Sequence, residues 1–293
     1  MGRKTKDSGV DGLLVVDKPP AWTSHDVVAK CRGAFGQRRA GHSGTLDPDA
    51  TGVLLIGFGQ VTKLLSLLTA LPKHYVGEVV LGAETSTLDS SGDVLRTYDM
   101  AGVTLDEACV AAATFVGDIL QVPPMVSAVQ VGGVRLHELA RQGIEIERAA
   151  RPVTVHRFEV TGWAAPGVLS IEVRCSSGTY VRTLAADLGN ALGGGAHLRN
   201  LRREAIGSFT AAEGAAIDDE LSSRPLLSPL DALRDYARVD VDEAFAVQIR
   251  NGRMVELDAT GSGPWAICGP DGALLAVYEH GGARMRPVVV LSR

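Results

Sequence analysis

Residues 12–34, GLLVVDKPPAWTSHDVVAKCRGA, contain the change of pattern from which the fold class can be inferred. The apolar run at 12–17 is stopped by Pro19 and Pro20, and Ser24 opens a stretch with helical spacing. This part of the chain therefore predicts a strand, a turn and a helix that ends near residue 34.

Beyond this stretch, strands and helices alternate irregularly, without the strict βαβ order of a doubly wound sheet, so the sequence predicts an α+β fold. A glycine-rich segment at 36–52 is expected to be a long loop. Thr104 and Glu107 form a capping-box pattern ahead of an alanine-rich helix that reaches about Phe115. The other predicted elements are strands at 53–58, 74–81, 126–131, 153–163 and 168–175, and helices at 62–71, 135–142 and 179–192.

The pattern changes again after about residue 235. One short helix at Glu243–Arg250 and an Asn251-Gly252 turn are followed by glycine-separated β-like runs. The predicted strands of this part lie at 264–268, 273–279 and 287–291. We therefore expect two domains: 1–235, with a mixed, largely antiparallel sheet and flanking helices, and 236–293, small and β-rich.

Composition places the chain among globular proteins. Its 293 residues are 45% hydrophobic and 22% charged, which excludes a disordered or collagen-like chain. No apolar stretch approaches the roughly 18 residues of a membrane helix, and no secretory signal precedes the first strand, so we expect a soluble, cytoplasmic protein. The four cysteines lie far apart in the sequence, and we expect them to be buried thiols rather than metal ligands.

The distribution of charge is informative, although the net charge of −5 alone argues against a nucleic-acid partner. Segment 30–63 has five cations against two carboxylates, and segment 174–203 has five arginines against Asp187. The acids are concentrated at 78–118 and 211–243. A cationic surface could therefore bind phosphates with the acidic segments facing away; the alternative is that the basic stretches are solvated helix faces.

Candidate catalytic residues lie in the loop Gly41–Pro48, GHSGTLDP, where side chains can project into a cleft. Asp47 is the candidate nucleophile, and an Asx turn before the proline is the alternative explanation for it. Arg182 could keep such a carboxylate ionised, unless it is an ordinary surface arginine. Tyr75 and Tyr180 could stack on a nucleobase or pack in the core. No metal-ligand cluster, phosphate-binding glycine loop or nucleophile elbow is found.

Several fragments occur together and in a fixed order, and this ensemble resembles the TruB family of tRNA pseudouridine synthases over essentially the whole chain. The tail resembles the RNA-binding PUA module. The fragments are Asp17-Lys18-Pro19, Trp22-Thr23-Ser24, Gly41–Pro48, Ala50-Thr51-Gly52, Lys73-His74-Tyr75, Gln121–Met125 with Ser127-Ala128, Gly178–Arg182, Ala196-His197-Leu198, Leu201-Arg202-Arg203, and in the tail Asn251-Gly252 and Gly281–Pro287.

The resemblance implies isomerisation of uridine 55 in the tRNA T-loop to pseudouridine, with tRNA as partner and no cofactor, metal or membrane; we expect a monomer. Asp47 would attack the sugar, remove a proton from it or attack the base, and the sequence leaves these three roles open. By the same resemblance, Tyr75 is the base that removes the proton from C5, and Arg182 pairs with Asp47. His42 would fill the gap left by the flipped base. The remaining family positions are Tyr180 and Leu201, which would line the pocket, and Lys18, which would support the catalytic loop.

Two departures from the family pattern concern the segment after the Pro-Pro pair. Val126 and Gln130 stand where the family usually has tyrosine and lysine, so substrate contacts expected there are in doubt. A non-catalytic tRNA-binding or tRNA-folding protein on the same scaffold is the alternative function, although it would be signalled by loss of Asp47. A nucleoside glycosidase is a third possibility, but such enzymes typically use two carboxylates, and only Asp49 lies near.

Overall fold

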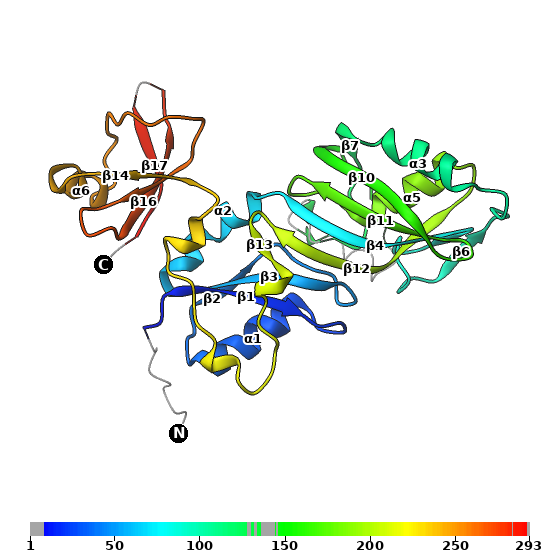
Figure 1. Cartoon of the computed structure of the whole chain (residues 1–293), viewed down its shortest axis with the longest axis horizontal. Coiled ribbons are helices and arrows are strands. Elements are labelled where there is room, and N and C mark those ends of the chain that lie inside the picture. Colours follow the sequence, from blue (N-terminus) through cyan, green and yellow to red (C-terminus); the bar gives the residue numbers. More distant parts are fainter. Residues whose placement is uncertain are drawn as a thin grey trace. The chain divides into compact units, whose positions relative to one another are not determined.

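A computed structural model describes residues 9–127, 130–131, 134–135, 144, 146–282 and 284–291, and its architecture is α+β (Figure 1). The chain divides into two compact units. The first unit consists of Met1–Pro48, Gly52–Ala70 and Gly207–Arg293, and the second of Asp49–Thr51 and Leu71–Ile206. The second unit is therefore almost one continuous stretch of chain, inserted into the sequence of the first.

In the first unit, β3 lies between β1 and β2 in an antiparallel arrangement. Helix α1 packs against these strands through Val27, Val28 and Cys31. Its N-terminus is capped by Thr23, and it ends at Gly36, whose φ of 60° is in the left-handed region that favours glycine. The elements are β1 (Gly12–Lys18), α1 (Ser24–Phe35), β2 (Ala40–Ser43), β3 (Thr51–Phe58), η1 (Gly59–Leu64), α2 (Leu65–Ala70), β13 (Phe209–Thr210), η2 (Ala211–Glu213), η3 (Leu221–Ser223) and η4 (Asp231–Leu233).

The outer edge of β1 is covered by chain that comes from more than 190 residues later. Leu227 and Leu13 exchange two main-chain hydrogen bonds of 2.8 and 2.9 Å. Ala215 N donates to Val15 O at 2.9 Å, and Asp17 N donates to Ala215 O at 3.0 Å. These bonds satisfy peptide groups that an open edge would leave unpaired.

The second unit is an antiparallel sheet in the order β12-β4-β11-β10-β7. Helices α3 and α5 lie on the same side of it, against β10 and β12 respectively (Figure 1). The elements are β4 (Lys73–Leu81), β5 (Ala83–Thr85), β6 (Val94–Thr97), α3 (Leu105–Ala113), β7 (Gly117–Gln121), β8 (Gln130–Val131), β9 (Val134–Arg135), β10 (Arg151–Ala165), β11 (Val168–Cys175), α5 (Val181–Ala191) and β12 (Ala196–Ile206).

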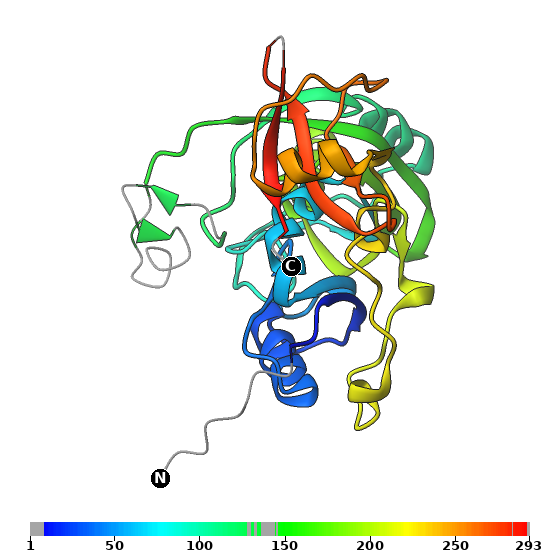
Figure 2. The same ribbon diagram turned by 90° about the vertical axis from the view of Figure 1, so that its left-hand side faces the viewer.

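The end of the chain forms a small sheet in the order β14-β15-β16-β17, in which only the β14–β15 pair is parallel. Helix α6 lies across it (Figure 2) and encloses an apolar core around Trp265 and Tyr278. Two hydrogen bonds tie this part to the η1–α2 segment, from Tyr236 Oη to Leu67 O and from Lys63 Nζ to Val290 O. The elements are β14 (Ala237–Asp240), α6 (Glu243–Arg250), β15 (Trp265–Cys268), β16 (Leu274–His280) and β17 (Met285–Val290).

The α+β class, the first strand and helix, and the Thr104 capping box are confirmed. The loop predicted at 36–52 is wrong in part, because β2 lies within it and pairs with β3. The helix predicted at 62–71 is instead the 3-10 turn η1 followed by α2. Of the strand predicted at 126–131, residues 126–127 form a bend and 130–131 are strand, and residues 128–129 lie outside the described part of the chain.

Three further expectations concern single segments. The helix predicted at 135–142 lies outside the described residues, apart from Arg135, which is in β9. Cys109 is exposed, so the expectation of four buried thiols is wrong for this residue; Cys31, Cys175 and Cys268 are buried and free. Within the described part of the chain, no helix is long and apolar enough to cross a membrane.

Candidate active site

Asp47 lies half-buried in the segment that joins β2 to β3. The residue before it is fixed by Ser24, the first residue of α1. Leu46 N donates to Ser24 Oγ at 2.9 Å, and this hydroxyl donates to Leu46 O at 3.2 Å. Because Ser24 is only 1% exposed, water does not compete with this two-point contact.

Lys18 fixes the residue after Asp47. Its ammonium donates to three carbonyl oxygens, those of Trp22 at 2.7 Å, Pro48 at 2.8 Å and Pro19 at 3.0 Å. The side chain is fully buried, and a buried ammonium is stable only when its donors are satisfied. The main chain is thus held on both sides of Asp47.

His42 lies on β2, in register with Ile56 of β3. Its ring meets the ring of His25 edge to face, with centroids 5.3 Å apart and an interplanar angle of 82°. The ring is half-buried. Lys18, His42 and Asp47 therefore all belong to the first unit, close to the junction of β1, β2 and α1.

The other four predicted site residues belong to the second unit. Tyr75 of β4 is 9% exposed and lies between Val173 of β11 and Arg203 of β12. Leu201 of β12 lies over Gly77 of β4, where a Cβ at the glycine would be in ordinary van der Waals contact with Leu201 Cδ1, at 3.5 Å. Tyr75 and Leu201 thus lie along the same pair of strands.

Tyr180 occupies the N-cap position of α5. Its main chain is pinned at two points by the side chain of Gln121, at the end of β7. Tyr180 N donates to Gln121 Oε1 at 2.7 Å, and Gln121 Nε2 donates to Tyr180 O at 3.1 Å. Gln121 is 3% exposed, so the first turn of α5 is anchored by a buried amide.

Arg182 lies in that first turn and is 5% exposed. Its Nη1 donates to Thr87 O at 3.1 Å and to Asp89 Oδ2 at 3.2 Å, and its Nη2 donates to Val126 O at 2.8 Å. The alternative of an ordinary surface arginine is therefore wrong. Val126, one of the two departures from the family pattern, contributes through its main chain, which any residue would supply.

Asp89 is a residue of this site that sequence reasoning missed. It belongs to the acidic stretch 78–118, which the charge count placed away from RNA, yet it forms an ion pair with buried Arg182. The signal in the sequence was the hydroxyl-rich, glycine-terminated segment 85–92, TSTLDSSG, which is typical of a turn built around an aspartate.

Lys73, at the start of β4, is a second buried lysine of the chain, 6% exposed. It donates to Leu71 O at 2.6 Å. Burial, and secondarily the nearby Arg203 cation, lowers the pKa of Lys73 to about 8. The strand that carries Tyr75 therefore begins at an ammonium group that loses its proton easily.

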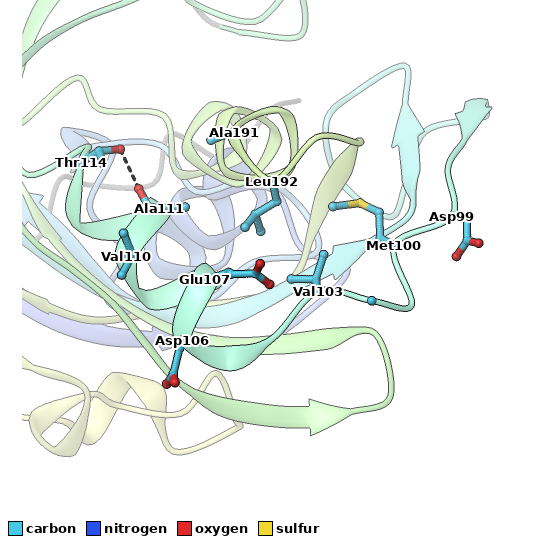
Figure 3. Close-up of a pocket in the computed structure, with 11 residues that line it drawn as sticks. Asp99, Met100, Val103, Asp106, Glu107, Val110, Ala111, Thr114, Ala191 and Leu192 are labelled. Carbon is cyan, nitrogen blue, oxygen red and sulfur yellow. Dashed lines mark hydrogen bonds between the residues drawn. The ribbon is translucent and has the colours of Figure 1, made fainter.

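A surface pocket of about 800 Å³ lies beside α3 and the end of α5 (Figure 3), but none of the predicted site residues lines it. Its rim includes Asp99, Asp106 and Glu107. The Glu107 carboxylate is already engaged in the capping box with Thr104. An acidic rim repels phosphates, so this pocket is not suited to bind the RNA backbone.

Two solved structures share this fold. The chain is similar to a chain of "Crystal Structure of a Cbf5-Nop10-Gar1 Complex", with a TM-score of 0.72 and 24% identity over 96% of this chain and 84% of that one. It is also similar to a chain of an H/ACA RNP bound to a substrate RNA containing 2′-deoxyuridine, with a TM-score of 0.71 and 21% identity over 96% and 85% of the two chains. These likenesses establish the fold.

The family follows from the sequence comparisons. The model described as "TruB family pseudouridylate synthase (N terminal domain)" matches residues 32–181. Two C-terminal models match residues 182–233, "tRNA pseudouridylate synthase B C-terminal domain", and 236–292, "tRNA Pseudouridine synthase II, C terminal". The chain belongs to the TruB family of pseudouridylate synthases, and it is an enzyme of that class.

Two relatives match almost end to end. A protein of Mycolicibacterium paratuberculosis named "tRNA pseudouridine synthase B" is 48% identical over 96% of this chain and 97% of its own length. A protein of Mycobacterium tuberculosis with the same name is 46% identical over 96% of this chain and 95% of its own.

Proposed function

We propose that this enzyme acts on tRNA and isomerises uridine 55 of the T-loop to pseudouridine. The family membership and the names of the relatives support tRNA as substrate. The observation that carries the proposal is the fixed main chain on both sides of Asp47, where Ser24 holds Leu46 and Lys18 holds Pro48. A loop fixed in this way aims a carboxylate, whereas a loop with only a turn function would not need two buried anchors.

In the proposed reaction the target base leaves the stack of the T-loop, because a stacked nucleotide is out of reach of a side chain in a protein cleft. His42 fills the gap in the RNA. The flipped base is received by Tyr75 as stacking partner, with Tyr180 and Leu201 lining the pocket. Each of these three side chains is at least half-buried, so the pocket offers apolar surface to the base.

The chemistry is an isomerisation in which nothing is added or lost. The bond between N1 and C1′ breaks with the help of Asp47, and the uracil leaves as an anion and turns within the pocket. C5 then bonds to C1′, the proton on C5 is transferred to Tyr75, and a proton is returned to the base. Arg182 supplies the positive charge that keeps the carboxylate of Asp47 ionised inside the pocket.

We also propose that residues 236–293 form an RNA-binding module that adds affinity rather than chemistry. Truncation after residue 235 is expected to weaken tRNA binding about tenfold or more, because phosphate contacts are lost, while the rate at saturating RNA persists. A soluble, folded truncation without any activity would contradict this assignment.

The full-length enzyme is proposed to work as a monomer in the cytoplasm.

The test is incubation of the purified enzyme with an unmodified tRNA transcript, followed by chemical mapping of pseudouridine along the RNA. We expect one modified position, uridine 55. A transcript with cytidine at that position is the matched control and should show none. Tight binding of the transcript without product would instead favour a tRNA-binding or tRNA-folding protein.

A further inference from the structure

The carboxylate of Asp89 is held by a cradle of donors from its own turn. Its Oδ1 accepts from Thr87 Oγ1 at 2.6 Å, from Ser91 Oγ at 2.5 Å and from Ser91 N at 3.1 Å. Its Oδ2 accepts from Arg182 Nη1 at 3.2 Å. One carboxylate oxygen therefore accepts hydrogen bonds from the turn, and the other accepts one from the guanidinium.

The turn itself is fixed to its surroundings. Leu88 has a φ of 62°, a left-handed conformation that is unfavourable for a branched side chain and persists only where neighbouring contacts impose it. Leu198 of β12 provides such contacts, since its N donates to Leu88 O and its O accepts from Ser90 N, both at 3.0 Å. At Gly92, a Cβ would lie 2.4 Å from Thr87 Oγ1, so only glycine leaves room for that hydroxyl.

We propose that Thr87 and Ser91 are positioning residues for Arg182, acting through Asp89. By occupying Oδ1 with three donors, they fix the rotation of the carboxylate so that Oδ2 faces the arginine. Thr87 acts twice, because its carbonyl oxygen accepts from the same Nη1 at 3.1 Å. Two acceptors on one nitrogen set the plane of the guanidinium, which a single charge at a distance would not do. This inference rests on the proposed function of Arg182.

The hydroxyl groups add a fixed rotation of the carboxylate, which its charge alone does not provide. An aspartate without the cradle would still attract the guanidinium, but it could rotate, and a misplacement of about 1 Å near reacting atoms can cost about 100-fold in rate. The cradle therefore affects the rate of the chemical step and leaves RNA affinity nearly unchanged, since affinity derives mainly from phosphate contacts elsewhere.

The test compares Thr87→Val, which keeps the shape without the hydroxyl, with Thr87→Ser, which keeps the hydroxyl. Single-turnover rates at saturating tRNA transcript, transcript affinity and melting temperature are measured for each. We expect Thr87→Val and Ser91→Ala to lower the rate about three- to tenfold, with affinity within twofold of wild type. Thr87→Ser should restore the rate to within about twofold.

Two controls separate positioning from folding. Ser86→Ala removes a hydroxyl from the same turn that accepts from Asp93 N and does not contact Asp89, so its rate should match wild type. In an Asp89→Asn background, Thr87→Val should have little further effect on the rate, because the group through which it acts has already been changed.

The inference is overturned if Thr87→Val matches wild type in rate, if Ser86→Ala loses as much rate as Thr87→Val, or if the loss is equally large in the Asp89→Asn background. A fall in affinity without a fall in rate would also overturn it. Failure of the proposed function is distinguishable, because wild-type enzyme would then make no pseudouridine at uridine 55, or Asp47→Asn would retain activity.

Discussion

Two of the site residues, Asp47 and Arg182, are held in different ways. In the first unit, contacts to main-chain atoms of Leu46 and Pro48 fix the loop around Asp47. In the second unit, Arg182 is held by its own side chain, which reaches two carbonyl oxygens and the Asp89 carboxylate. The contacts around Asp47 fix the main chain from which its side chain starts. The contacts of Arg182 fix the charged group at the end of its side chain.

This difference predicts how each region responds to substitution. A loop held through its main chain keeps its course when the side chain at its centre is exchanged, so chemistry can be removed without loss of structure. A guanidinium held through its side chain loses its position when its geometry changes, even if its charge remains. The predictions below test this contrast, from the largest expected effect to the smallest.

Asp47→Asn should abolish pseudouridine formation, because the amide has the same shape without the charge. Affinity for tRNA should stay within a few-fold of wild type with an unchanged salt dependence, and the melting temperature should be preserved. Product formation, affinity and melting are measured on one preparation. Retained activity would exclude Asp47 as the essential carboxylate, and loss of folding and binding together would indicate that it serves only the turn.

Lys18→Met should lower the single-turnover rate about 100-fold, because the loop after Asp47 loses its anchor. Three carbonyl oxygens also lose their buried donor, and we expect the free energy of unfolding to fall by about 1–3 kcal/mol. Lys30→Met, on the exposed side of α1, is the matched control for both measurements. A normal rate in a destabilised Lys18→Met enzyme would show that the anchor is not needed for chemistry.

Arg182→Lys should lower the single-turnover rate at least about tenfold while tRNA affinity changes little, since an ammonium keeps the charge but cannot reproduce the planar fork. Arg174→Lys provides the control, because Arg174 belongs to the same basic stretch and its side chain is 55% exposed. If both variants turn over at the wild-type rate, the geometry of the guanidinium has no part in the reaction.

Lys73 should make stability depend on pH. Its folded-state pKa of about 8 lies below the ordinary 10.5, so the unfolded chain binds more protons between these values, and stability rises as the pH increases through 8. Between pH 7 and pH 9, the free energy of unfolding of wild type should gain about 1 kcal/mol relative to Lys73→Met, measured by urea titration. A difference that stays flat or falls with pH would contradict the shift.

Most of the helices and strands that the sequence predicts correctly are specified by residues close together in the chain. The helix that begins at Ser24, the cap at Thr104 and the apolar runs of β1 and β11 depend on neighbours in the chain, and these elements were predicted within a few residues. Strand β12 was missed because it is rich in arginine. Its pairing with β4 accounts for one of these arginines, since Arg199 pairs with Glu78 of that strand at 2.6 Å.

The same distinction between nearby and distant partners in the chain applies to the residues of the candidate site. Asp47, Lys18 and their loop could be found because their fragments lie close together in the sequence, and their proposed roles stay predictions. Asp89 was missed because its partner Arg182 is distant in the chain, and because segment 85–92 indicates a turn around this aspartate without specifying the pair. A lone aspartate in an acidic stretch is indistinguishable from a solvated one until the fold brings a buried cation to it.

The order of synthesis matters for β1, because the residues that cover its outer edge, Ala215 and Leu227, come more than 190 residues later in the chain. Residues 71–206 leave the ribosome as one continuous stretch and can form their sheet early, as domains generally fold as units during synthesis. Strand β1 emerges first, yet its edge is closed only when Ala215 and Leu227 have been added. The first unit, with Lys18 and Asp47, is therefore completed last, so a nascent chain holds a finished second unit before it has a finished first one.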